Sequence, residues 1–196
     1  RSVVIIMYRI KPSWVSSICL TILLFLLCAC STTTGNLAPT RDATTSPQTG
    51  TGVTGASATE GQIAQAVFQA INQSRAANGL PALTWSTALA NSARQHNLAM
   101  QAANTLSHQL PGEAGLGDRE RQQGVNWSWA AENIGETSDT TVNGALGLHQ
   151  AMMGEQPPND GHRQNILTTN GNLVGIAILI DQQHGEFWLT EDFAHV

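Results

Sequence analysis

The chain has 196 residues, of which 41% are hydrophobic and 12% charged, and its formal net charge is −5 at pH 7. This length suits one domain of ordinary size with appended segments. Nine basic residues against 14 acidic ones do not provide the dense positive face with which a nucleic-acid binder neutralises phosphates. The composition therefore argues against nucleic acid as a partner.

Residues 1–29 have the layout of a secretory signal. Arg9 and Lys11 precede an apolar run that ends at Leu27 and is too short to span a hydrocarbon core of roughly 30 Å. The sequence Leu-Cys-Ala-Cys that follows resembles a bacterial lipobox, with Cys30 as the lipidated residue. We expect an exported protein held at a membrane by a lipid on Cys30. Cleavage without lipidation and an uncleaved N-terminal anchor are the alternatives.

All three cysteines lie at or before residue 30, so the exported part has no pair with which to form an internal disulfide. This also excludes a cysteine nucleophile and a cysteine-ligated metal site in the domain. Without residues 1–29, six arginines face 14 acidic residues, no lysine is left, and the net charge is −8. Such an acidic chain suits an exported protein or a cation binder.

Residues 30–60 are predicted to be a tether. From Ser31 to Glu60 the chain holds ten threonines, three serines, four glycines and two prolines, and few large apolar side chains. Such a segment cannot bury enough surface to offset its chain entropy. The folded domain is therefore expected over residues 61–196.

The first part of this domain is predicted to be helical. Ile63, Val67 and Ile71 recur at helical spacing, and Gly79 followed by Pro81 ends that helix. Further helices are expected from an N-cap at Ser86, near Asp118, from a capping Asp139 to Gly154, and over 162–167.

The end of the chain differs in kind. Residues 173–180 form an apolar, β-branched run, a Gln-Gln-His-Gly turn follows, and residues 187–193 form a second apolar run. Helices followed by a terminal hairpin predict an α+β fold, with helices packed on an antiparallel sheet.

Two of the six histidines stand out as site candidates. His108 and His162 each close an element beside turn-forming residues, where binding and catalytic sites are commonly built. His96 lies on the apolar face of its helix and is expected in the core. His149 is expected at the surface or in packing. His184 and His195 are expected in solvent.

Two glutamates are candidates as well. Glu132 has small and apolar neighbours, so it is either hydrogen-bonded structurally or presented to a site. Glu155 lies on the inward face of its helix at the C-terminal end, where the helix dipole disfavours a carboxylate. We therefore expect it to meet a compensating partner.

Two histidines and two carboxylates suit a divalent cation such as Zn²⁺, or acid–base catalysis with a histidine paired to a carboxylate. Their spacing in sequence does not decide between these uses. Trp127 and Trp129 either line an apolar ligand groove or close a core.

Several short motifs in this order resemble the CAP superfamily, which is named after cysteine-rich secretory proteins, antigen 5 and pathogenesis-related proteins. The resemblance covers essentially all of residues 61–196. The motifs are Ile71–Leu83, Leu106-Ser107-His108, Ala131-Glu132-Asn133-Ile134, Gly161–Leu167, Val174-Gly175-Ile176 and Phe187-Trp188-Leu189.

The resemblance implies a three-layer α-β-α sandwich with a central antiparallel sheet and a large cleft. It implies that His108 and His162 bind a divalent metal, with Glu132 and Glu155 as the cleft carboxylates.

The resemblance leaves three kinds of function. The first is a cell-envelope binding protein that holds a metal and a lipid or wall fragment without turnover. The second is a hydrolase with His108 or His162 as the base, assisted by Glu132 or by a metal-bound water. The third is an interaction domain braced by these four residues.

Overall fold

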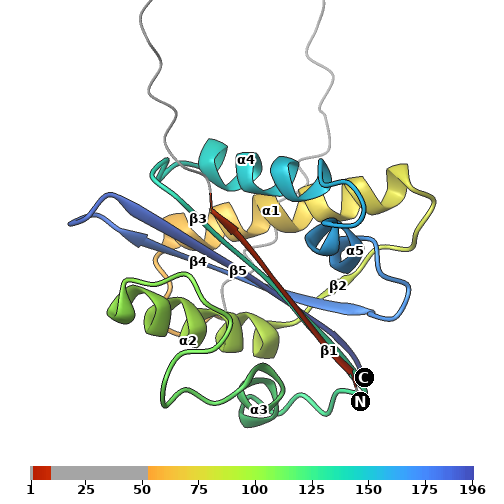
Figure 1. The fold of residues 1–196 in the computed structure, drawn as a ribbon, viewed down its shortest axis with the longest axis horizontal. Coiled ribbons are helices and arrows are strands. Elements are labelled where there is room, and N and C mark those ends of the chain that lie inside the picture. Colours follow the sequence, from red (N-terminus) through yellow and green to blue (C-terminus); the bar gives the residue numbers. More distant parts are fainter. Residues whose placement is uncertain (1, 10–52) are drawn as a thin grey trace, which may run out of the picture. The chain divides into compact units, whose positions relative to one another are not determined.

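A computed structural model describes residues 2–9 and 53–196, so the predictions for residues 10–52, including Cys30, lie outside the described residues. Five helices and five strands make up this part of the chain (Figure 1). The helices are α1 (Ala58–Ala77), α2 (Thr87–Ala103), α3 (Leu116–Gln122), α4 (Val142–Met153) and α5 (Gly161–Ile166). The strands are β1 (Ser2–Arg9), β2 (Thr84–Trp85), β3 (Trp129–Thr137), β4 (Leu173–Asp181) and β5 (Glu186–His195).

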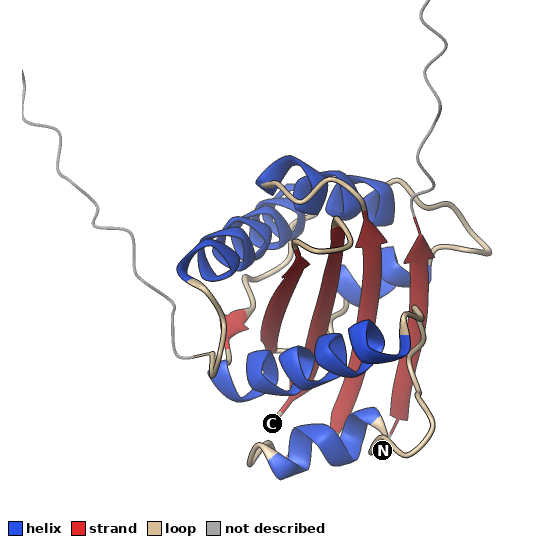
Figure 2. Ribbon diagram, turned by 90° about the vertical axis from the view of Figure 1, so that its left-hand side faces the viewer, coloured by secondary structure: helices blue, strands red, loops and turns tan. Residues whose placement is uncertain are grey.

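The strands form one sheet in the order β1-β3-β5-β4-β2. β5 lies between β3 and β4 and is antiparallel to both, whereas β1 and β2 run parallel to their neighbours. Helices α1, α4 and α5 cover one face, and α2 and α3 cover the other (Figures 1 and 2). The predicted α+β sandwich and the terminal hairpin are confirmed.

The helices begin where short polar side chains accept backbone N–H groups. Ser57 and Glu60 form a capping box at α1, so residues 58–60 belong to the domain rather than to the predicted tether. Ser86 caps α2 as predicted, accepting from the N–H of Leu89. At α4 the N-cap is Thr141 instead of Asp139, whose carboxylate binds the Thr141 N–H at 3.0 Å.

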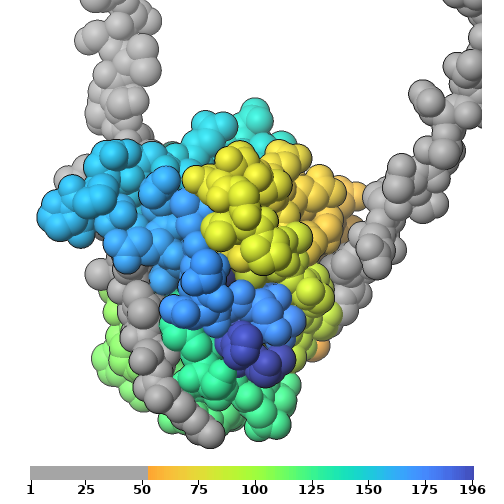
Figure 3. Space-filling model, turned by 90° about the vertical axis from the view of Figure 1, so that its right-hand side faces the viewer, coloured from red at the N-terminus to blue at the C-terminus, as the bar shows by residue number. Residues whose placement is uncertain are grey.

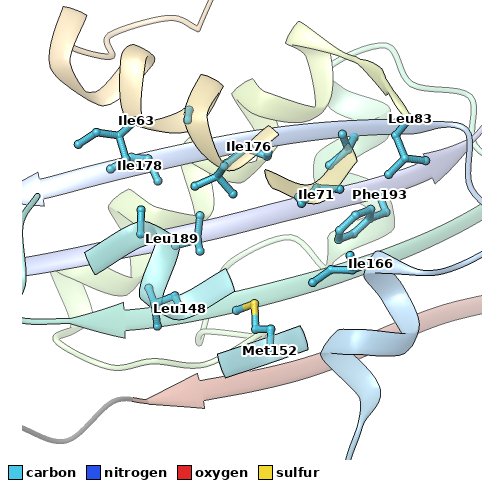
Figure 4. Close-up of a cluster of buried hydrophobic side chains, with 14 of the residues drawn as sticks. Ile63, Ile71, Leu83, Leu148, Met152, Ile166, Ile176, Ile178, Leu189 and Phe193 are labelled. Atoms are coloured by element: carbon cyan, nitrogen blue, oxygen red, sulfur yellow. The ribbon is translucent and has the colours of Figure 1, made fainter. Parts of the chain in front are cut away.

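The main core lies between the sheet and helices α1, α4 and α5 (Figure 4). Val67 and Ile71 of α1, spaced one turn apart, are fully buried where α1 packs on β4, in a cluster that also holds side chains of β5. Leu148 and Met152 of α4 reach the same core from the next helix. The helical spacing read from the sequence therefore identifies the buried faces correctly.

A buried arginine ties α1 to the segment that follows α5. The Arg75 guanidinium donates to the carbonyl oxygens of Ile166 and Thr168, both at 2.8 Å, and its Nε donates to that of Pro81 at 2.9 Å. In Figure 3 the end of α1 and its following loop lie against this later segment. The contact holds α5, which carries His162, in place.

The opposite face of the sheet packs closely on α2. Gly175 of β4 lies where α2 crosses the sheet, and a Cβ there would be 2.1 Å from the Ala90 nitrogen. Within the described residues, no helix is long and apolar enough to cross a membrane.

Residues of the predicted leader take part in the sheet. Ser2–Arg9 pair with β3 over eight residues, from Ser2 opposite Trp129 to Arg9 opposite Glu136. The rest of residues 1–29 lies outside the described residues, so the signal peptide stays a prediction.

Candidate functional site

His108 and Glu132 form the first of two histidine–glutamate pairs. His108 lies in the loop after α2, and Glu132 lies in the middle of β3 with its side chain on the α2 side of the sheet. The His108 Nδ1 is 2.6 Å from the Glu132 Oε1, and the Glu132 side chain is fully buried. A buried carboxylate at this distance fixes the orientation of the imidazole ring.

His162 and Glu155 form the second pair. Glu155 follows the C-cap of α4, and His162 is the second residue of α5. The His162 Nδ1 is 2.5 Å from the Glu155 Oε1, and the His162 backbone N–H donates to Oε2 at 3.0 Å. These contacts are the compensating partner expected for a carboxylate at the end of α4.

Both pairs are attached to consecutive residues of β3. The Asn133 amide donates to the His162 carbonyl oxygen at 3.3 Å, and the Asn165 amide donates to the Glu132 carbonyl oxygen at 3.4 Å. Asn165 also donates to the Asn133 Oδ1 at 2.9 Å. The structure thus brings the His108–Glu132 pair and the backbone of His162 to neighbouring residues of β3.

An ionic network surrounds Glu132. The Arg119 guanidinium of α3 pairs with the Glu132 Oε2, and both side chains are buried. His96 binds the Glu113 Oε1 through Nδ1 at 2.8 Å, and its Nε2 is 3.7 Å from the Glu132 Oε1. Burial and the nearby Arg119 lower the pKa of His96 to about 3, so this predicted core histidine is neutral. Burial raises the pKa of Glu132 to about 7 although Arg119 opposes the shift.

Two further acidic side chains lie behind this network. Glu120 of α3 and Asp192 of β5 are fully buried, and neither Glu120 oxygen accepts a hydrogen bond from a described residue. Burial, with the charges of Asp192 and Glu132, raises the pKa of Glu120 to about 9. Burial and the charge of Glu132 raise the pKa of Asp192 well above its usual value. Burial thus raises the pKa of each of the four carboxyl groups around the buried guanidinium of Arg119, which are Glu113, Glu120, Glu132 and Asp192.

The stability of the domain is expected to fall as the pH rises from 7 to 9. Glu120 is protonated in the folded chain up to about pH 9 but ionised in the unfolded chain above its ordinary pKa of 4.5. The folded state then binds more protons, so the free energy of unfolding decreases by up to about 1.4 kcal/mol per pH unit for each such proton. Urea unfolding at pH 7, 8 and 9 measures this slope.

In that experiment Glu120→Gln should make the free energy of unfolding less dependent on pH between 7 and 9, because the amide cannot ionise. Asp118→Asn is the matched control, since Asp118 is an exposed acid of the same helix, paired with Arg121 at 3.0 Å. A wild-type profile that is flat between pH 7 and 9 contradicts the prediction.

The histidine pairs fit a metal site in one respect. Histidine ligands of metals commonly hold one ring nitrogen against a carboxylate and bind the metal through the other. In His108 and His162 the Nδ1 faces a glutamate, as in such ligands. The described residues contain no group of three or more His, Cys, Asp or Glu side chains arranged around an ion. The roles of His108, His162, Glu132 and Glu155 at a metal therefore stay predictions.

The two tryptophans do not lie together. Trp127 packs in a core cluster on the α2 side and donates from Nε1 to the Gly117 carbonyl oxygen at 2.9 Å. Trp129 packs against the main core on the other face of the sheet. The structure therefore does not form one groove from both.

The remaining histidines lie where they were expected. His149 packs inside, 2.9 Å from the Ser74 hydroxyl. His184 and His195 are exposed.

Sequence reasoning missed the partners Arg119, Glu120 and Asp192. The first two lie three and four residues after Leu116, on one buried face of a short helix. Asp192 lies beside Glu191 in β5, and both carboxyl groups are buried. A charged residue at an inward position of a strand or helix is the signal that could have indicated them.

Comparison with protein families places most of the chain in one group. The family model described as "CAP: Cysteine-rich secretory protein family" matches residues 68–193, more than half of the chain. A search of curated proteins finds no match.

Solved structures resemble the same region. An extracellular protein of Bacillus anthracis that contains an SCP domain is 26% identical, with a TM-score of 0.58 over 70% of this chain. An outer surface protein of Borrelia burgdorferi has a TM-score of 0.58 at 15% identity, covering 68% of this chain and 92% of its own. A cysteine-rich secretory protein of Staphylococcus aureus has a TM-score of 0.55 at 18% identity, covering 70% and 39%. This chain spans 41% of the B. anthracis protein.

Proposed function

The chain belongs to the cysteine-rich secretory protein (CAP) family, and on that premise we propose that it is an exported binding protein of the cell envelope. Its two His–Glu pairs hold a divalent cation, such as Zn²⁺, beside an extracellular ligand that is not turned over. The leader and the lipobox at Cys30 support export and lipid anchoring, and the similar B. anthracis protein is described as extracellular.

The observation that carries the proposal is the matching geometry of the two pairs. Each histidine has its Nδ1 against a glutamate, at 2.6 Å in one pair and 2.5 Å in the other. A carboxylate in this position raises the basicity of the opposite nitrogen and selects its tautomer. When bound there, a divalent cation supplies positive charge to an otherwise acidic domain.

A serine hydrolase is disfavoured by the same geometry. Ser107, adjacent to His108, is half-buried in its loop and donates its hydroxyl to the Gln109 carbonyl oxygen at 2.9 Å. Its proton is thus directed at its own loop rather than at the imidazole.

Calorimetric titration of the full chain with Zn²⁺ tests the proposal. We expect one ion per chain, and loss of binding in the His108→Ala, His162→Ala double variant. Glu155→Gln should weaken binding by about 10- to 100-fold, because it removes only the orienting carboxylate.

His184→Ala provides the matched control. His184 also binds a carboxylate through Nδ1, that of Asp181 at 2.8 Å, but it is exposed. Its removal should leave the stoichiometry and affinity unchanged. A folded wild-type chain that takes up no zinc rejects the metal site, and equal losses in the control and the double variant reject the assignment of His108 and His162.

A further inference from the structure

The edge of the sheet beside the histidine pairs is covered by a single strand. β1 is the outermost strand in the sheet order, and it is the neighbour that pairs with the outer side of β3. The pairing is parallel and continuous, with eight residues of β1 in register with β3. Without β1, the nine-residue β3 would present an unpaired row of backbone N–H and C=O groups.

This covering strand comes from the segment predicted to be removed on export. Ser2–Arg9 lie within residues 1–29, whose layout is that of a secretory signal. If processing removes them, a long strand edge is left in the mature protein. Long exposed edges pair readily with another extended chain, so such an edge is either protected or used for binding.

The covered edge lies at the candidate site. In the register, Ile5 is opposite Glu132, which holds His108, and Ile6 is opposite Asn133, which binds the His162 carbonyl oxygen. Helix α5, which carries His162, also packs against β1. A strand added here therefore lies beside both His–Glu pairs.

The segment that occupies the edge indicates what kind of chain fits it. Ser2–Arg9 has the sequence Ser-Val-Val-Ile-Ile-Met-Tyr-Arg, with four consecutive β-branched apolar residues and a basic residue at its end. The basic residue is in register with Glu136, in a domain whose net charge without the leader is −8. An extended, β-branched peptide with a basic C-terminal end matches both features.

We propose that, once the leader is removed, the outer edge of β3 binds an extended peptide segment of another protein by parallel strand addition. Until then, Ser2–Arg9 of the leader pair with this edge. The extracellular ligand of the binding protein is then a polypeptide, and this inference rests on the proposed function. Main-chain hydrogen bonds to β3 supply the affinity, and the alternate side chains supply the selectivity.

The test uses the full chain, with a specific protease site inserted at residue 30 so that the leader can be cut and removed. Hydrogen exchange of the β3 amides is measured before cutting, after removal of the leader, and after addition of a fluorescent peptide with the sequence of residues 2–9. We expect exchange of β3 amides at least tenfold faster after removal of the leader, and restored protection with the peptide. The same peptide with proline in place of Ile5 should bind at least tenfold more weakly, because proline cannot pair in the ladder.

Unchanged exchange in β3 after removal of the leader, or no binding of the peptide by a chain that circular dichroism shows to be folded, overturns the inference. Dimerisation of the cut chain with β3 protected in the absence of peptide also overturns it, since the edge is then paired with a second copy. Zinc titration of the same cut sample separates the two hypotheses. Zinc binding without peptide binding retains the metal site alone, and peptide binding without zinc binding retains the strand edge alone.

Discussion

Replacing Gly175 by alanine is expected to destabilise the domain by about 3 kcal/mol or more. A Cβ at this position would lie 2.1 Å from the Ala90 nitrogen and 2.4 Å from the Leu89 carbonyl carbon. Both neighbours are backbone atoms of α2, so relief requires the whole helix to move away from β4. Urea unfolding of the variant measures the loss.

Gly147→Ala is the matched control. Gly147 lies in α4, and a Cβ there would meet nothing within 4 Å. Alanine in place of glycine in a helix is favourable by up to about 1 kcal/mol, so this variant should unfold at equal or higher urea concentration. If Gly175→Ala is as stable as wild type, α2 does not cross β4 as closely as the structure has it.

Replacing Arg119 by methionine is expected to cost about 3–5 kcal/mol at pH 7, as breaking one partner of a buried ion pair does. Arg119 is 2% exposed and pairs with the fully buried Glu132, which would otherwise have no cation beside it. The loss should be smaller at pH 5, because Glu132, whose pKa burial already raises, then takes up a proton. Urea unfolding at both pH values measures the difference.

Two further variants show whether the cost comes from the pair. In the Arg119→Met background, Glu132→Gln should recover part of the lost stability, since it removes the unpaired charge. Arg121→Met should cost less than about 1 kcal/mol, because Arg121 is on the outer side of α3, paired with Asp118 and stacked on Trp127. Equal losses in Arg119→Met and Arg121→Met contradict the central role of the buried pair.

The different effects expected for Arg119→Met and Arg121→Met depend on the position of the arginine rather than on the residue type. Arg119 and Arg121 are two residues apart, yet one faces β3 and the other faces solvent. Glu120 and Asp118 differ in the same way. A short helix presents neighbouring residues in different directions, and only its docking against the sheet decides which charge is buried.

Strand β3 was not predicted, although it carries the centre of the site. Its sequence, Trp-Ala-Ala-Glu-Asn-Ile-Gly-Glu-Thr, has few β-branched residues and no regular alternation of apolar and polar side chains. Residues of this kind have low strand propensity. The strand is instead specified by its pairing with β5 and by burial between two helix layers. Both are long-range features that local patterns do not show.

The sequence by itself determined the helices with regular apolar spacing, the N-cap at Ser86, the terminal hairpin, and four site candidates: His108, Glu132, Glu155 and His162. These follow from local periodicity, from turn residues and from a resemblance between short motifs. Only the tertiary structure decided that each histidine pairs with one glutamate, that both pairs meet on β3, and that Arg119, Glu120 and Asp192 share the interior with them. The reason is physical: the energy of a buried charge depends on which groups surround it, and these groups come from elements far apart in the chain.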